Sequence, residues 1–252
     1  MPSEHRKSAH YLLGAISVVA GLTIWAIAAW YTDSALLPTP VSVLKSFSEM
    51  TQTGDLYQSV FDSASRVIIG YLIGTLAGIS TGVILGGSKL ISELLSPLFD
   101  FFKGLPPIAL VPIAIMWFGI GEMSKYVVIA YIVWIVVAVS TLSGLREVPT
   151  IRIKIGQIMG LSHFQIYMKI ALPTAMPYIF LGMRTAIGFA YVALVSAELI
   201  GANTGIGYLI MDYRFSLQTS KMIAAIVLLG VLGSLTQMLF DIIIKRTRLY
   251  LK

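Results

Sequence analysis

Cysteine is absent from this sequence, which excludes disulfide bonds, thiolate metal sites and cysteine nucleophiles. The three histidines, His5, His10 and His163, are scattered along the chain without the spacing of metal ligands, so we expect no metal site. No Gly-Lys-Ser or Gly-Lys-Thr occurs, so the chain has no P-loop for nucleotide phosphates. If ATP drives this protein, another polypeptide must hydrolyse it.

Charged residues are scarce as well. They make up 12% of the 252 residues, against about 25% in soluble domains, whereas 57% of the residues are hydrophobic. The mean hydropathy is +0.85. A membrane-spanning helix needs about 20 predominantly apolar residues, and the sequence contains several such runs. We therefore predict an all-α, polytopic membrane protein in which a single transmembrane domain occupies residues 1–252.

Six membrane spans are predicted, at roughly residues 11–31, 67–88, 104–121, 126–145, 177–199 and 222–240. The third is short and contains Pro112, where a kink is expected. An alternative for the first is a cleaved signal peptide, because Ala26-Ile27-Ala28 resembles a cleavage site. Its apolar run is longer than the usual ~7–15 residues of a signal peptide, which favours a retained span.

Basic residues near the span ends predict the orientation, because cytoplasmic loops are enriched in lysine and arginine. If the N-terminus is inside, the inner segments contain Arg6, Lys7, Lys89, Lys103, Arg146, Arg152, Lys154, Lys169, Lys245, Arg246, Arg248 and Lys252. The outer segments then contain Lys45, Arg66, Lys125, Arg214 and Lys221. We expect both termini and the loop 146–176 to be cytoplasmic. This bias accounts for the net charge of +6, so we expect no nucleic-acid partner.

The loop 146–176 contains a predicted helical elbow. Ser162 and Gln165 form a capping-box pattern at a helix start, flanked by Leu161 and Ile166 at the positions of a hydrophobic staple. Gly160 can supply the left-handed residue that ends the preceding helix. The predicted elbow, a candidate docking site for a partner, consists of Gln157, Gly160, Leu161, Ser162, His163, Phe164 and Gln165.

The second span carries a glycine at every fourth position, namely Gly70, Gly74, Gly78, Gly82 and Gly86. Small residues in a row let two helix backbones approach closely within a bilayer. We interpret the row as a packing face inside one subunit. The alternative is a sliding face between helices that move during a transport cycle.

Two charged residues, Arg184 and Glu198, lie within the fifth span, where they mark an ion pair, a cavity or a pathway. On a continuous helix they are roughly 20 Å apart, so they cannot easily pair with each other. Arg184 could attract an anion, or it could serve a structural role. The aromatic residues Tyr131, Trp134 and Tyr191 are further candidates for lining a path, although aromatic residues within spans more often pack.

Gly160 followed by Ile170-Ala171-Leu172-Pro173 resembles the signature loop of ABC importer permeases, in which Glu-Ala-Ala, three residues, Gly and nine residues precede Ile-x-Leu-Pro. This sequence has Lys154-Ile155-Gly156 in place of Glu-Ala-Ala. Other segments resemble the nitrate/sulfonate/taurine subgroup, namely Leu36-Leu37-Pro38-Thr39-Pro40, Leu105-Pro106-Pro107-Ile108-Ala109, Trp117-Phe118-Gly119-Ile120-Gly121-Glu122 with Ser124-Lys125, Ala197-Glu198-Leu199-Ile200 and Gly205-Ile206-Gly207-Tyr208-Leu209-Ile210.

The resemblance implies a MetI-like, type I importer permease of the bacterial inner membrane. It implies pairing with a second permease, docking of two cytoplasmic ATPase subunits on the elbow, and cargo delivery by an extracytoplasmic binding protein. ATP and magnesium would bind to the ATPase, leaving this chain without a cofactor or catalytic residue. The implied cargo is a small anion such as a sulfonate, taurine, nitrate or bicarbonate, although related permeases also carry uncharged or cationic vitamin precursors.

Two hypotheses from other functional classes compete with an importer permease. A self-sufficient secondary transporter or channel would use Arg184 and Glu198 as an ion-coupled site and the glycine-lined span as a gate. A membrane-embedded enzyme would need paired acids, a Ser/His pair or a metal cluster at one depth. The acids here are scattered and the predicted spans contain no inward-facing histidine, so the sequence favours a non-enzyme.

Overall fold

The computed structural model describes residues 4–32, 36–52 and 54–246, with side chains from Leu13 onward except those of Ala15 and Asp55. Every regular element in these ranges is a helix. The elements are α1 (Glu4–Thr32), α2 (Pro40–Gln52), α3 (Asp55–Gly87), α4 (Lys89–Gly104), α5 (Pro107–Phe118), α6 (Glu122–Arg146), α7 (Thr150–Ile158), α8 (His163–Ile166), the π-helix η1 (Tyr167–Ala171), α9 (Leu172–Gly201), α10 (Ile206–Phe215) and α11 (Thr219–Arg246). Both termini were expected to be cytoplasmic, and the chain ends, residues 1–3 and 247–252, lie outside the described residues.

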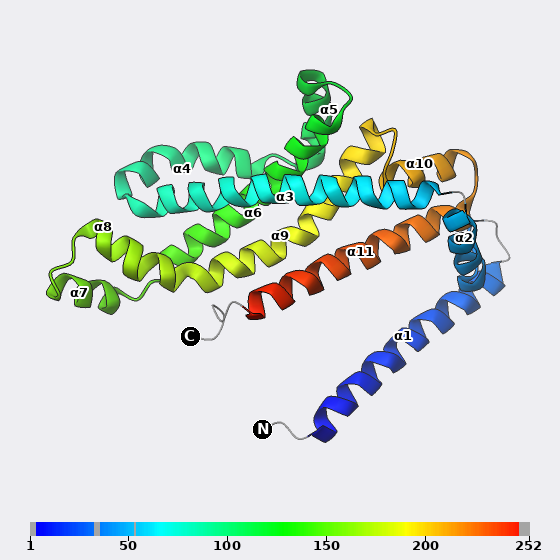
Figure 1. Ribbon diagram of the computed structural model, residues 1–252, viewed down its shortest axis with the longest axis horizontal. Helices are drawn as coiled ribbons and strands as arrows, with labels where there is room; N and C mark the ends of the chain where they lie inside the picture. The colour runs from blue at the N-terminus through cyan, green and yellow to red at the C-terminus, as the bar shows by residue number, and fades with distance from the viewer. Residues whose placement is uncertain (1–3, 33–35, 53, 247–252) are drawn as a thin grey trace.

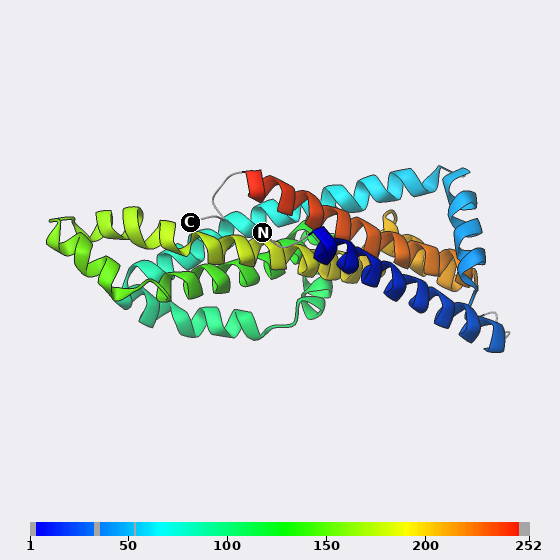
Figure 2. The same ribbon diagram turned by 90° about the horizontal axis from the view of Figure 1, so that it is seen from below.

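Three long helices, α3, α6 and α9, form the centre of an elongated bundle (Figure 1). Their shared core is apolar and almost free of solvent, with Val133, Ala190 and Leu194 all 0% exposed. Helices α7 and α8 project from one end of the bundle, whereas α2 and α10 lie at the other (Figures 1 and 2). The molecule therefore presents two distinct ends, which we call the elbow end and the α2 end.

The predicted glycine row lies along the contact between α3 and α6. A Cβ atom on Gly74 would lie 2.4 Å from the carbonyl oxygen of Ala130, and one on Gly78 would lie 2.7 Å from Cβ of Val137. The other three glycines of the row, Gly70, Gly82 and Gly86, also face α6 side chains at less than 3 Å. Because these distances leave no room for a side chain, the row sets how closely the two helices approach.

Four helices are long and apolar enough to cross a membrane, within Leu56–Gly87, Glu122–Arg146, His163–Gly201 and Thr219–Arg246. The expected third span, 104–121, corresponds in the structure to the short helix α5, which is joined to α4 at a bend of 94°. The bend lies at Leu105-Pro106, where both residues are extended because a residue that precedes proline avoids helical geometry. Pro112 lies inside α5 without ending it.

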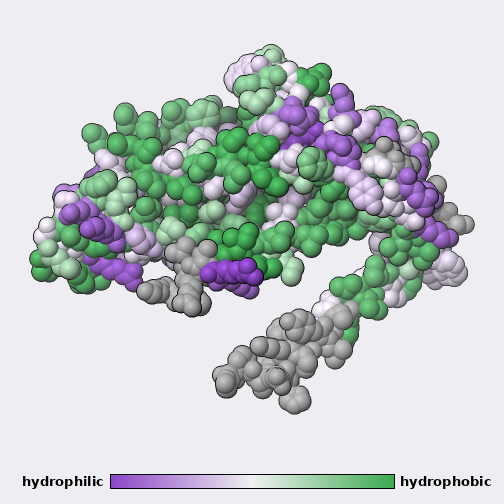
Figure 3. Space-filling model, in the orientation of Figure 1, coloured by the Kyte–Doolittle hydropathy of each residue, from purple (hydrophilic) through white to green (hydrophobic). Residues whose placement is uncertain are grey.

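Helix α1 stands away from the bundle and contacts mainly α2 (Figure 1). Of its described side chains, Ala29 is buried, and Trp25 Nε1 donates a 3.1 Å hydrogen bond to the carbonyl oxygen of Pro38. Large apolar residues are exposed along α1 and over the middle of the bundle, while hydrophilic residues gather toward the two ends (Figure 3). This surface suits a lipid environment, because apolar side chains lose nothing by facing acyl chains.

Candidate functional site

The elbow end is built around one turn. Helix α7 ends in a Schellman motif: Leu161 N–H donates to the carbonyl of Gly156, and Gly160 N–H donates to that of Gln157, both at 3.0 Å. Gly160 has a φ of +73°, which is the left-handed conformation that the motif requires at this position. The turn therefore depends on glycine for its backbone and not for space, since nothing lies within 4 Å of a Cβ built there.

The predicted capping box is present. Ser162 Oγ accepts a 3.3 Å hydrogen bond from the Gln165 N–H, and Gln165 Oε1 accepts one of 2.9 Å from the Ser162 N–H. Each side chain thus satisfies a backbone donor that the helix itself leaves free. Two consecutive local motifs, one ending α7 and one starting α8, make the elbow a fixed bend.

Apolar side chains project from the elbow. Ile158 is 86% exposed, Met159 71% and Phe164 69%. Ile151 and Ile155 extend the same exposed set along α7, and we call these five residues the elbow surface. Exposed apolar patches rimmed by polar residues are typical of protein interaction sites. The elbow surface therefore has the character of a docking site for another protein.

The elbow is also fastened to the bundle behind it. A Cβ on Gly156 would lie 2.8 Å from Cδ1 of Ile170, so the absence of a side chain lets α7 pack against η1. Arg152 Nη1 donates a 3.0 Å hydrogen bond to Oγ1 of Thr174, at the start of α9. Gly156 occupies the third position of the segment where the related signature has Glu-Ala-Ala, so this departure has a packing role here.

A second attachment reaches α3. The hydroxyl of Tyr167, the first residue of η1, donates a 2.6 Å hydrogen bond to the carbonyl oxygen of Val83. Its ring lies against Gly87, the last residue of α3, since a Cβ built there would be 3.5 Å from the ring. The π-helical stretch thus joins the elbow to two core helices, through the chain to α9 and through Tyr167 to α3.

At the α2 end, Arg66 is the centre of a buried ion cluster. It is 1% exposed, and its guanidinium donates at 2.6 and 2.7 Å to both oxygens of Glu122. It also donates at 2.7 Å to Glu198, and at 2.7 and 2.9 Å to the carbonyl and hydroxyl of Thr204. Arg66 therefore joins α3, α6, α9 and the α9–α10 loop.

Glu198, one of the predicted membrane charges, lies inside this cluster and is 1% exposed. Its carboxylate accepts hydrogen bonds from Arg66 at 2.7 Å, from the Ser63 hydroxyl at 2.8 Å and from the Gly207 N–H at 2.7 Å. Ser63 in turn accepts from the Ile206 N–H at 2.9 Å. A buried charge is tolerated where it is paired and hydrogen-bonded in this way.

The other candidate pathway residues are distributed over the bundle. Arg184 pairs with Asp241 of α11 at 2.8 Å, away from Glu198. The Trp134 indole N–H donates a hydrogen bond to Thr81 at 2.9 Å, and the Tyr131 hydroxyl donates one to the carbonyl of Phe102. Both side chains pack in an aromatic cluster beside α4. Tyr191 is buried in the core beside Thr236.

Sequence reasoning did not find the partners of these charges. Arg66, Glu122 and Asp241 stand at or near predicted span ends, where a charged residue is ordinarily solvated. The available signal was topological, because Arg66, Glu122 and Glu198 all fall at the same side of the membrane in the six-span arrangement. Among the described residues, no group of acidic or histidine side chains is placed to hold a metal ion.

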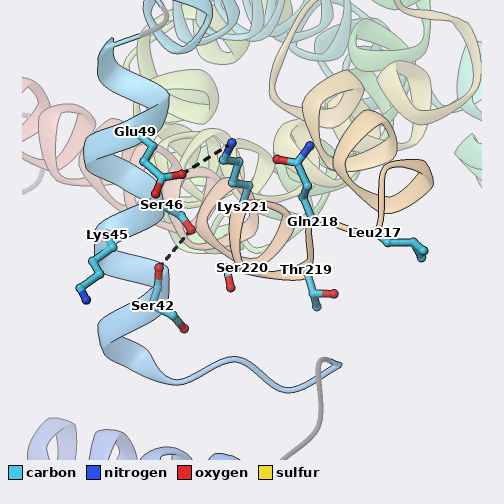
Figure 4. A pocket seen from close by; sticks show the side chains of 9 residues that line it. All are labelled: Ser42, Lys45, Ser46, Glu49, Leu217, Gln218, Thr219, Ser220 and Lys221. Atoms are coloured by element: carbon cyan, nitrogen blue, oxygen red, sulfur yellow. Dashed lines mark hydrogen bonds and ion pairs between the residues drawn. The ribbon is translucent and has the colours of Figure 1, made fainter.

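A polar groove of about 510 Å³ lies at the α2 end, between α2 and the junction of α10 with α11 (Figure 4). Glu49 and Lys221 face each other across it at 3.6 Å. Lys45 points away from the groove and Leu217 away from the rest of its lining (Figure 4). The groove is thus a surface feature at the end opposite the elbow.

Residues 70–249 match the family model described as the binding-protein-dependent transport system inner membrane component. The chain is 33% identical over 92% of its length to the putative aliphatic sulfonates transport permease protein SsuC of Bacillus subtilis, covering 84% of that protein. It is 31% identical over 90% of its length to the taurine transport system permease protein TauC of Escherichia coli, again covering 84%. With the nitrate import permease protein NrtB of a Synechocystis species the identity is 31%, over 88% of this chain and 83% of that one.

Among solved structures, the fold is similar to that of a chain of the MetNI methionine ABC transporter in an inward-facing conformation. The TM-score is 0.67 with 21% identity, over 78% of this chain and 97% of the other. At this identity the match establishes the fold and nothing finer. It agrees with the all-α, MetI-like architecture expected from the sequence.

Proposed function

Because this chain belongs to the family of binding-protein-dependent transport system inner membrane components, we propose that it moves a small solute into the cytoplasm by alternating access, driven by a separate ATPase. Membership makes the chain a multi-pass membrane permease, related to those of sulfonate, taurine and nitrate importers, and not an enzyme. The energy source, the cargo and the assembly are our proposal.

The elbow surface carries this proposal. A chain without a P-loop needs a site at which an external motor can act, and Ile158, Met159 and Phe164 expose apolar area on a rigid, doubly capped turn. Force applied there reaches α9 through the chain and α3 through Tyr167. Two ATPase subunits would dock on the elbows of two permease copies and would bind the ATP and magnesium, leaving this chain without a cofactor.

The proposed cargo is a small anion such as a sulfonate, taurine, nitrate or bicarbonate. The three relatives named above are described as permeases for aliphatic sulfonates, taurine and nitrate, which supports this class. Arg184 is the proposed contact along the path, since its side chain is 43% exposed beside Asp241. A solute-binding protein on the outer side would select and deliver the anion, and both termini of this chain would lie in the cytoplasm.

The competing secondary-transporter hypothesis has less support in the geometry. It requires Arg184 and Glu198 to act as one ion-coupled site, but each has a separate partner of opposite charge on another helix. Uptake by the purified chain in ATP-free liposomes would nevertheless establish that hypothesis and contradict ours.

Docking on the elbow is tested by co-purification of the chain with a P-loop ATPase from cells that produce both. Ile158→Asp places a charge in the elbow surface and should abolish co-purification. Leu217→Asp is a matched control, since Leu217 is also 86% exposed but lies at the α2 end, and it should retain the ATPase. Gly160→Val should also release the ATPase, because a β-branched residue cannot readily adopt a φ of +73°. Retention of the ATPase by both elbow variants would refute docking at this site.

A further inference from the structure

The ion pair between α9 and α11 stands beside a small pocket. The pocket has a volume of about 160 Å³ and is lined by residues of these two helices, namely Phe180, Arg184, Phe240, Asp241, Ile244 and Lys245. Neighbours four positions apart on a helix share one face, as Asp241 and Lys245 do here. Helix α11 runs from the α2 end and stops short of the elbow end, so the pocket lies beside its last turns (Figure 1).

The pocket has an excess of positive charge. Asp241 accepts from one of the five N–H donors of the Arg184 guanidinium, at 2.8 Å, and Arg184 has no other partner in the described part of the chain. The Nε atom of Arg184 is buried without an acceptor. Lys245 has no ion-pair partner among the described residues. Two cations against one carboxylate leave a single positive charge, which complements a monovalent anion.

The rest of the lining is apolar. Phe180 and Ile244 are each 8% exposed, and Phe240 packs against the core. An anion without an apolar part, such as nitrate or bicarbonate, would lose water against this wall and gain no contact from it. A short alkyl chain on the anion would instead bury its own apolar surface there.

The volume restricts the ligand to a small solute. The pocket has room for about five water molecules, at ~30 Å³ each. Pockets that enclose larger organic ligands measure about 300–1,000 Å³. Charge, lining and volume together describe a small oxyanion that carries a short apolar tail.

We propose that this pocket binds an alkanesulfonate. Its oxygens accept hydrogen bonds from Arg184 and Lys245. Its alkyl chain lies against Phe180 and Phe240. The inference rests on the proposed function and narrows its cargo, because it selects a sulfonate with an apolar tail over nitrate and bicarbonate. It also makes Asp241 a counterion that competes with the cargo for Arg184.

Binding is measured on the full-length chain in phosphatidylcholine nanodiscs, without ATPase or ATP, by saturation-transfer NMR of methane-, ethane- and propanesulfonate. Each added methylene that enters the pocket should lower the dissociation constant about fourfold. Nitrate, measured by competition with propanesulfonate, should bind about tenfold more weakly or worse. Equal affinities along the series, equal affinity for nitrate, or no binding by any of these anions would overturn the inference.

Three variants test the assigned residues. Asp241→Asn removes the competing carboxylate and keeps the size of the side chain, so it should tighten propanesulfonate binding about fivefold, whereas mere damage to the fold would weaken it. Lys245→Gln should weaken binding about fivefold. Arg246→Gln is the matched control, because it removes the same charge from the next exposed residue, which lies outside the lining, and its effect should stay below about twofold. Weaker binding in Asp241→Asn, or equal effects of the two glutamine variants, would contradict the assignment.

Two further measurements separate this inference from its alternatives. If phosphatidylglycerol in the nanodisc abolishes propanesulfonate binding, the pocket holds a lipid phosphate and the inference is overturned. Uptake of nitrate but not of sulfonates by the complete complex of permease, ATPase and binding protein would overturn the inference and leave the importer intact. If that complex takes up no anion when ATP is added, the proposed function itself fails, whatever the isolated chain binds.

Discussion

At the scale of single residues, Arg66 is the side chain on which most other groups converge. All five of its N–H donors are matched by the contacts to Glu122, Glu198 and Thr204, which is the full capacity of a guanidinium. Lysine could not replace it, because a point charge lacks the planar fork that holds both oxygens of Glu122. The cluster therefore fixes where α3, α6 and α9 meet at the α2 end.

Arg66→Met should destabilise the protein by about 3–5 kcal/mol, because it leaves Glu198 charged, buried and without its counterion. The free energy of unfolding in detergent, measured by denaturant titration, checks this value. Lys89→Met is the control, since the Lys89–Glu93 pair is solvent-exposed and should contribute nothing measurable. Equal stability of the two variants would argue against a structural role for the cluster.

The local features of the elbow were predictable from sequence, whereas the partners of the charges were not. Ser162, Gln165 and Gly160 act through hydrogen bonds to backbone no more than a few residues away, so their spacing alone identifies the motif. Arg66 and Glu198 are 132 positions apart, and Arg184 and Asp241 are 57 apart. Such pairs depend on the packing of whole helices, which a single sequence does not encode locally.

At the scale of elements, the glycine row makes α3 and α6 a closely fitted pair. Gly74→Ala should lower stability by about 1–3 kcal/mol, because its Cβ would lie 2.4 Å from the Ala130 carbonyl oxygen, which is part of a helix backbone and cannot move aside. A thermal melt of the purified protein in detergent measures the effect.

Gly188→Ala is the matched control for this prediction. Gly188 also lies inside a long helix, but nothing is within 4 Å of a Cβ built there. Alanine has a higher helix propensity than glycine, so this variant should be as stable as the unsubstituted protein or slightly more stable. If both alanines have the same effect, the close approach of α3 and α6 is not what the row provides.

Helices α4 and α5 differ in detail from the single short span expected at residues 104–121. The prolines near residue 106 correctly indicated an interruption, whereas α5 continues through Pro112, which lies inside it. The 94° bend follows from two successive extended residues, Leu105 and Pro106. Composition alone could not distinguish a straight short span from a bent pair.

At the scale of the whole molecule, the absence of cysteine allows a direct test of orientation. Ile158→Cys and Leu217→Cys place single thiols at opposite ends of the bundle, at positions that are both 86% exposed. A membrane-impermeant maleimide added to intact cells should label the thiol at 217 and spare the one at 158. After the cells are opened, both should react. The reverse pattern would place the elbow outside and remove the basis for docking an ATPase there.

The Tyr167 hydroxyl links the elbow directly to α3, in addition to the chain connection between the elbow and α9. Had the elbow been joined to the bundle by the polypeptide alone, a pull on it would rotate α9 and leave its neighbours behind. The hydrogen bond to Val83 would transmit the same movement to α3. The close contact of the glycine row of α3 with α6 would then transmit it to α6. These three helices should consequently move as one rigid block, so that opening and closing would require movement between this block and the helices that surround it.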